Sequence, residues 1–220
     1  MQRQETDIYT SNSVDSMARS NQRRNRQGMD IDKTGKVQHP RVRLAIHGAI
    51  QRGEMKVING IIVHQTGAST AQSSFNSYKT ANPNGAHFLI DKDGTIYQTA
   101  SIYQKTHHVG FIKSRCMEEH KCTPAEVAAL KGKTVGRQIG TVEKQKPFPK
   151  RYPDNNDSIG IEIVSGVQGQ TFEAVTGAQQ VSLTWLTAQL TSTLGISTRE
   201  IYRHPQVSWK NATEASTAQW

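Results

Sequence analysis

Two short segments of the chain alternate apolar and other residues with the period of two that is typical of β-strands. In residues 56–65 (KVINGIIVHQ) this alternation puts Ile62 and His64 on the same face. In residues 158–164 (SIGIEIV) it puts three isoleucines on one face and Glu162 on the other. We therefore expect two internal strands, each of which carries one ionisable side chain in an otherwise apolar setting.

A hairpin and a long helix are predicted from the same kind of patterning. Residues 87–98 (HFLIDKDGTIYQ) form two apolar arms around Asp93-Gly94, a dipeptide that readily makes a tight turn. Over residues 176–194 leucines recur at spacings of three and four, with Thr176 and Gln179 as a capping box and a glycine after the last turn. This is the clearest helix in the sequence.

These elements predict an α/β fold, a single domain with a central mixed β-sheet flanked by helices. We expect a polar, basic N-terminal extension at residues 1–45, with a short helix around residues 42–50, and the domain itself at residues 46–220. Residues 111–157, rich in Lys, Gly and Pro, are predicted to be a loop-rich insertion with one short helix that begins after Thr123.

The chain is basic, with a formal net charge of +9 over 220 residues and a mean hydropathy of -0.63. Such a charge favours a polyanionic partner, which leaves nucleic acid, an anionic membrane surface and an anionic wall polymer open. The arginines at residues 19–26 have no aromatic residues between them, so we interpret this segment as a solvated arm. Composition does not choose among these partners. Nucleic-acid binding rests on this charge alone and ranks last among the functions considered, so we expect no nucleic-acid partner.

No segment has the ~20 consecutive apolar residues that a membrane-spanning helix needs, so we expect no membrane span. The polar N-terminus also lacks the apolar core of a signal peptide. We expect synthesis in the cytoplasm without a signal peptide. Cys116 and Cys122 are the two cysteines, and the sequence leaves a local disulfide and two free thiols equally open.

Four ionisable residues suggest chemistry when they are taken together. His64 ends an apolar strand, Glu162 interrupts another, and His204 follows a short predicted strand with Glu214 ten residues later. Two histidines and a carboxylate are a common ligand set for catalytic Zn²⁺, with the fourth position left for water. A further carboxylate is needed to carry protons, and an apolar strand would raise the pKa of Glu162 toward that task.

The order of several motifs resembles the zinc-dependent N-acetylmuramoyl-L-alanine amidases, whose fold is shared with peptidoglycan recognition proteins and several phage amidases. The matching pieces are IIVHQT at 61–66, GAHFLIDKDGTIYQ at 85–98, HVG at 108–110, SIGIEIV at 158–164 and IYRHPQVSWKNATEA at 201–215. Together they span residues 56–217 in the family's order.

The resemblance implies a role for each matching residue. It implies that His64, His204 and Glu214 bind the metal, with Glu214 in the place of the family's usual aspartate, and that Glu162 is the catalytic glutamate. A second departure concerns a lysine that helps to stabilise the developing oxyanion in this family.

That lysine position is Ala212 here, and Lys210, Arg203, His107 and His108 are candidates to replace it. His87 and His108 match positions that line the cleft or support the fold. We assign His87, His108 and Lys210 to substrate binding, with structural support as the equal alternative for the two histidines.

The resemblance implies hydrolysis of the amide between N-acetylmuramic acid and L-alanine, with peptidoglycan or muropeptides as the substrate. A binding module without catalysis is the alternative from another class, but such a module has no need for all four residues. A role as an interbacterial effector or phage-type lysin, acting in the periplasm or on the cell wall after export or lysis, is favoured over cytosolic muropeptide recycling. An immunity protein or a secretion apparatus would then be a partner.

Overall fold

The computed structural model describes residues 28–220, and the basic segment at residues 19–26 therefore lies outside the described residues. Within the described part of the chain, no helix has the length and apolar character needed to cross a membrane.

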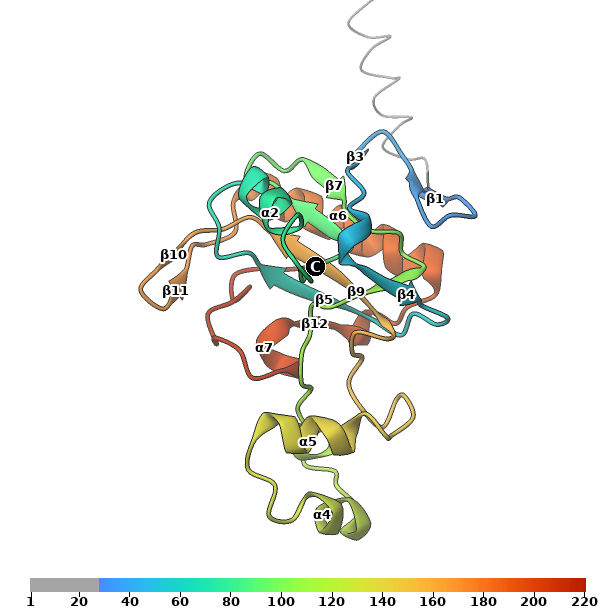
Figure 1. The fold of residues 1–220 in the computed structure, drawn as a ribbon, viewed down its shortest axis with the longest axis vertical. Coiled ribbons are helices and arrows are strands. Elements are labelled where there is room, and N and C mark those ends of the chain that lie inside the picture. Colours follow the sequence, from blue (N-terminus) through green and yellow to red (C-terminus); the bar gives the residue numbers. More distant parts are fainter. Residues whose placement is uncertain (1–27) are drawn as a thin grey trace, which may run out of the picture.

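A six-stranded mixed sheet forms the centre of the fold, in the order β12-β5-β9-β6-β7-β3 (Figure 1). The strands are β12 (Ile201–Arg203), β5 (Gly60–Gln65), β9 (Ser158–Ile163), β6 (Phe88–Ile90), β7 (Ile96–Gln98) and β3 (Val42–Leu44). The first four of these run parallel, β7 is antiparallel to β6, and β3 is parallel to β7. The predicted α/β domain with a mixed central sheet is confirmed.

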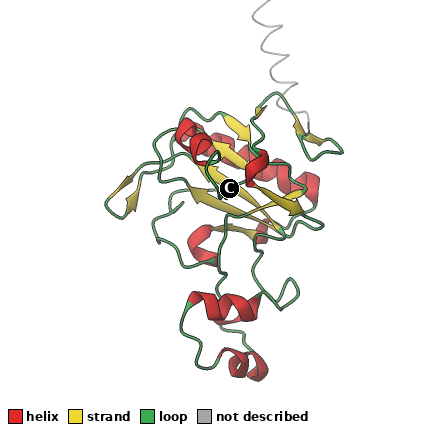
Figure 2. Ribbon diagram, in the orientation of Figure 1, coloured by secondary structure: helices red, strands yellow, loops and turns green. Residues whose placement is uncertain are grey.

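One face of the sheet is covered by the long helix α6 (Gly177–Leu194) (Figure 2). Leu183, Leu186 and Leu190 of α6 are fully buried in one cluster with isoleucines of β5, β6 and β9. Thr176 and Gln179 form the predicted capping box, and Gly195 ends the helix in the left-handed conformation at φ +67°. The predicted alternation along β9 is therefore confirmed, and the face that carries its isoleucines packs against α6.

The opposite face of the sheet carries His64 and Glu162, which are register partners on β5 and β9. Two short helices lie toward this face, α2 (Ala71–Ser77) with Thr70 as its N-cap, and α7 (His204–Val207) directly after β12. The 3-10 turn η2 (Thr198–Glu200) leads into β12.

The predicted hairpin is formed by β6 and β7. Its turn is closed by hydrogen bonds from the Asp91 amide to the Thr95 carbonyl and from the Gly94 amide to the Asp91 carbonyl, and Gly94 adopts φ +83°. A Cβ at Gly94 would lie 2.7 Å from the Ala178 carbonyl oxygen at the start of α6, so this turn needs glycine for its conformation and for its space.

The prediction of a short helix around residues 42–50 is wrong. The structure has strand β3 and one 3-10 turn, η1 (Gly48–Ile50), before β4 (Gln51–Glu54), which pairs with β8 (Gln104–Thr106). Val42 is buried in the main core cluster whereas Arg43 and Leu44 are exposed, as in an edge strand whose conformation depends on its pairing with β7. The small hairpin of β1 (Asp30–Ile31) and β2 (Val37–Gln38) precedes it, so the boundary expected at residue 45 falls after a strand of the sheet.

The insertion at residues 111–157 projects from the sheet domain as three short helices joined by loops (Figure 1). These are α3 (Arg115–Glu118), α4 (Pro124–Leu130) and α5 (Gly136–Glu143), and α4 begins at Thr123 with a capping box, as predicted. Cys116 and Cys122 form a disulfide, which answers the question that the sequence left open.

A separate small hairpin, β10 (Val167–Gln168) with β11 (Thr171–Phe172), follows β9.

Candidate metal centre

His64, His204 and Glu214 form a buried cluster at one end of the parallel strands. Each offers one ligand atom, and these atoms lie within 4.8 Å of one another. The sheet produces this arrangement, because Arg203 of β12 is the register partner of Val63 of β5. The residues that follow them, His204 and His64, therefore lie side by side. Glu214 completes the cluster from the C-terminal segment, with its Oε1 atom 2.9 Å from Nδ1 of His204 and 3.5 Å from Nδ1 of His64.

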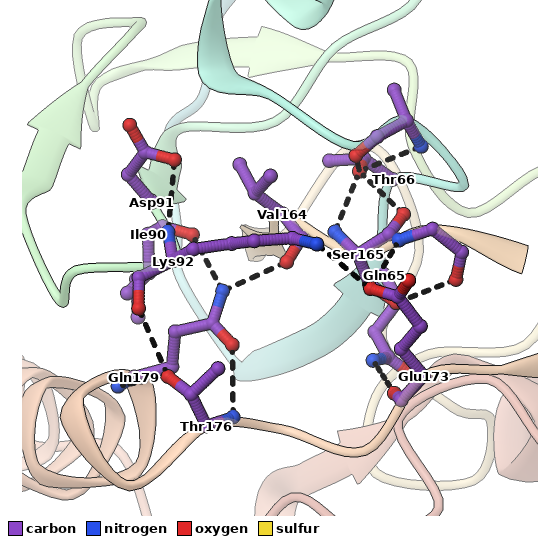
Figure 3. Close-up of polar contacts among 12 residues, drawn as sticks. Gln65, Thr66, Ile90, Asp91, Lys92, Val164, Ser165, Glu173, Thr176 and Gln179 are labelled. Atoms are coloured by element: carbon purple, nitrogen blue, oxygen red, sulfur yellow. Dashed lines mark hydrogen bonds and ion pairs between the residues drawn. The ribbon is translucent and has the colours of Figure 1, made fainter.

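The segment that carries Glu214 is fixed to β5 by Gln65. The Gln65 Oε1 atom accepts a hydrogen bond of 2.7 Å from the Ala215 amide, and its Nε2 atom donates one of 2.8 Å to the Glu173 carbonyl. Figure 3 shows this amide among the contacts that connect the ends of β5 and β9 to the segment before α6. The position of Glu214 therefore depends on a buried amide as well as on its own contacts.

The hydrogen-bond network assigns the tautomer of His204. Its Nε2 atom lies 2.9 Å from the Val109 carbonyl oxygen, which accepts only, so Nε2 carries the hydrogen. In the neutral ring the Nδ1 atom then presents a lone pair toward Glu214.

A second chain of bonds assigns His64 in the same way. The Nε2 atom of His108 lies 3.3 Å from the Ser158 carbonyl oxygen and donates to it, so Nδ1 of His108 is an acceptor. That acceptor lies 2.9 Å from Nε2 of His64, which therefore donates. Burial, followed by the neighbouring histidines His64 and His87, lowers the pKa of His108 and keeps its ring neutral. The result is that Nδ1 of His64 also presents a lone pair toward Glu214.

The Nδ1 atoms of both rings thus face one carboxylate oxygen, and a cation at their meeting point would be coordinated by all three residues. Zinc takes histidine nitrogen and carboxylate oxygen as ligands, and its histidine ligands usually donate their other N–H to a carbonyl or a similar acceptor. The three residues and their outer partners therefore fit a zinc ion. Glu214 meets this requirement despite its extra methylene relative to aspartate, because its Oε1 atom reaches both rings.

Glu162 lies beside this cluster on β9. It is partly accessible from the cleft, but its Oε2 atom is enclosed and has no hydrogen-bond partner among the described residues. Burial, followed by the negative charge of Glu214, raises the pKa of Glu162 to about 8, with Lys210 acting in the opposite direction. The carboxyl group can therefore exchange a proton near neutral pH.

A cleft of about 650 Å³ opens over the cluster. Its lining comes from the end of β5, from β9, from α2, from the segment before β6, from the segment after β8, from the insertion and from the C-terminal segment. The lining includes His64, Gln65, Ser74, Ser77, Tyr78, His107, His108, Phe111, Lys144, Asn155, Glu162, His204, Lys210 and Glu214.

Of the three residues assigned to substrate binding, two line the cleft and one does not. Lys210 and His108 line the cleft, and His108 also contacts His64. His87 is fully buried away from the cleft lining, where its Nδ1 atom accepts from the Gly160 amide and its Nε2 atom donates to the Gln104 carbonyl. For His87 the structure therefore favours support of the fold over substrate contact.

The candidates to replace the family's lysine, whose position is Ala212 here, also differ in whether they line the cleft. Ala212 is exposed outside the cleft lining, and Arg203 is used to hold the C-terminal segment through the Ala215 and Ala218 carbonyls. His108 lines the cleft, but both of its ring nitrogens are used, by His64 and by the Ser158 carbonyl. Lys210 and His107 line the cleft and remain candidates.

Sequence reasoning missed three residues of the site. Tyr78 is buried in the cleft wall, and burial, followed by the charge of Glu162, raises the pKa of its hydroxyl above its usual range. Asn155 accepts hydrogen bonds from the His108 and Val109 amides, and Lys144 reaches the cleft from the insertion. All three stand in polar segments without periodicity, so no pattern in the sequence marks them.

Fold and site together define an α/β domain with a cluster of two histidines and a glutamate that could hold a metal ion, at the floor of a cleft and next to a carboxyl group of raised pKa. The sequence profile of the N-acetylmuramoyl-L-alanine amidases matches residues 54–217, and the chain belongs to this family. The resemblance drawn from the motifs is confirmed.

Among solved structures, that of an AmpD derivative is 17% identical, has a TM-score of 0.53 and covers 87% of this chain and 96% of its own. The endolysin amidase LysCS from Clostridium intestinale URNW is 19% identical, with a TM-score of 0.47 and coverage of 78% and 85%. The catalytic domain of XlyA is 20% identical, with a TM-score of 0.48 and coverage of 77% and 87%. Comparison with curated proteins gives no match.

Proposed function

We propose that this peptidoglycan amidase hydrolyses the bond between N-acetylmuramic acid and L-alanine with the help of a zinc ion held by His64, His204 and Glu214. The observation that carries the proposal is the position of Glu162. A carboxyl group of raised pKa, with an unpartnered oxygen, lies next to a cluster whose lone pairs all face one point. A purely binding module gains nothing from such a costly group.

Zinc in such a site supplies a Lewis acid for the amide carbonyl and makes water a nucleophile at neutral pH. The protein's own residues do the rest. Glu162 takes a proton from the attacking water and delivers it to the nitrogen of the leaving L-alanine, which breaks the amide bond. Its raised pKa suits both halves of this transfer, because the group is readily protonated and readily deprotonated near neutral pH.

Lys210 supports the developing negative charge on the carbonyl oxygen in this proposal. Its side chain lines the cleft and is close enough to contribute to the pKa values of His64 and Glu162. It stands two residues before Ala212, so it supplies a cation to the same cleft from the same segment. Removing a donor of this kind costs about 10²–10³ in rate in other hydrolases.

Digestion of purified sacculi by the wild-type chain and by Glu162→Gln tests the reaction. We expect the wild type to release free peptides that begin with L-alanine, and the variant to release them far more slowly while it still binds zinc. Mass analysis identifies the new ends. Release of glycan fragments with intact lactyl-peptide amides would refute the proposal.

We further propose that the enzyme acts in the periplasm or on the cell wall, as an interbacterial effector or a phage-type lysin. The Cys116–Cys122 disulfide supports this, because disulfides persist in oxidising compartments, and the charge of +9 suits an anionic wall. Expression in a Gram-negative host with and without an added export signal tests the proposal. We expect lysis only with export and only with Glu162 intact, and equal toxicity without export would contradict it.

A further inference from the structure

The insertion supplies one wall of the cleft through an unusually close contact of helix α5. A Cβ at Gly136 would lie 2.7 Å from the ring of Trp209, and one at Gly140 would lie 3.1 Å from Cβ of Phe111. The two glycines are four residues apart and therefore lie on one face of the helix. Their lack of side chains lets α5 lie directly against Phe111 and Trp209.

This contact brings basic side chains to the aromatic residue at the cleft edge. Phe111 lines the cleft and is 41% exposed. The Lys144 ammonium lies 5.7 Å from the centre of its ring, and the Arg137 guanidinium lies 5.8 Å from the same point. Lys144 is the C-cap of α5 and lines the cleft itself, so the helix ends by presenting a cation to the substrate space.

The charge of Lys144 is not used by the fold. Its neighbour Lys146 forms ion pairs with Glu126 and Glu143 at 3.0 and 2.7 Å, which join α4 to α5. Within the described residues, neither Lys144 nor Lys210 has an acidic partner within ion-pair distance. The acidic residues of the cleft lining are Glu214, which belongs to the candidate metal centre, and Glu162 beside it.

We propose that Lys144 binds a carboxylate of the substrate's peptide, and that the insertion therefore gives this amidase a preference for stems with free carboxylates. The inference rests on the proposed function for the identity of the substrate. The peptide is the anionic part of the substrate, because the hydroxyl and acetamido groups of the sugar are neutral and its lactyl group is tied up in the amide. An ammonium beside an aromatic face, open to solvent on its other side, suits a mobile carboxylate.

Equilibrium binding to Glu162→Gln protein loaded with zinc tests the subsite without any need for hydrolysis. The ligands are N-acetylmuramoyl-L-alanyl-D-glutamate with both carboxylates free and the same compound with both amidated. We expect the free acid to bind about threefold to fivefold more tightly, the range typical of an exposed ion pair, and the difference to shrink at high salt. Adding Lys144→Gln removes the difference, whereas Lys144→Arg keeps it.

Lys131→Gln is the matched control, since Lys131 is an exposed lysine of the same insertion outside the cleft lining. Its variant keeps the preference of the parent protein. Equal affinity for acid and amide, or a preference that survives Lys144→Gln, overturns the inference. Wild-type kinetics separate the two proposals: cleavage of both ligands without a difference in KM contradicts the subsite alone, and selective binding without any cleavage contradicts the proposed function alone.

Discussion

His64 and Glu162 are register partners on the adjacent parallel strands β5 and β9, so a histidine of the candidate metal centre and a carboxyl group of raised pKa lie side by side on the same face of the sheet. Their separation is set by strand spacing rather than by a loop, and both strands are held from behind by the buried contact with α6. A reaction that needs both groups at one point is therefore supported by the most rigid part of the fold.

Replacing Glu162 with Gln separates proton transfer from metal binding. The amide keeps the shape of the side chain but cannot accept the proton of water, so we expect kcat to fall by about 10²–10⁴. Zinc content should stay at the wild-type level because Glu162 is not one of the clustered ligand residues. Muropeptide cleavage and metal analysis of the same preparation provide the check, and loss of zinc together with activity would contradict the assignment.

Replacing His108 with Ala weakens metal binding from outside the ligand set. His108 fixes His64 through the contact of 2.9 Å between their ring nitrogens, and such outer partners typically contribute 10–100-fold to metal affinity. We expect a loss of that size in a chelator competition assay. His107→Ala is the matched control, since His107 lines the same cleft but has no hydrogen bond to a ligand residue among the described residues, and its zinc affinity should be unchanged.

Removing the metal lowers thermal stability. A cation that binds the folded chain alone stabilises it by about 2.7 kcal/mol at one hundred times its Kd, which corresponds to a change in Tm of about 5–10 °C for a domain of this size. We expect a chelator to cause this decrease and added zinc to reverse it. His204→Ala should show little response to either, and an equal response in both proteins would place the stabilising metal elsewhere.

Local patterns were sufficient for the elements with a clear period. The two central strands and α6 follow from alternation, leucine spacing and caps, because each buries one regular face. The edge strand β3 was mistaken for a helix, since its three residues show no period and only pairing with β7 makes them extended.

The site was predictable where a residue stands on a patterned strand or in a motif. His64 and Glu162 belong to the first kind, and His204 with Glu214 to the second. The hydrogen bonds that orient the rings were not predictable, because the Val109 carbonyl and Asn155 meet their partners only after folding. Lys144 escaped notice for the same reason, since α5 reaches the cleft through packing that no local spacing reveals.

His87 makes the fold sensitive to acid. Its neutral ring accepts from the Gly160 amide and donates to the Gln104 carbonyl, and burial lowers its pKa to about 4, against about 6.5 in an unfolded chain. The unfolded state therefore takes up the proton first as the pH falls, so stability is full above pH 6.5 and declines between about pH 6.5 and 4. The total loss from this group is about 3 kcal/mol.

We expect the free energy of unfolding, measured in urea with zinc present throughout, to decrease less between pH 7 and pH 5 for His87→Gln than for the wild type. The variant itself is less stable at pH 7. An unchanged pH dependence in the variant would show that His87 is not the group responsible.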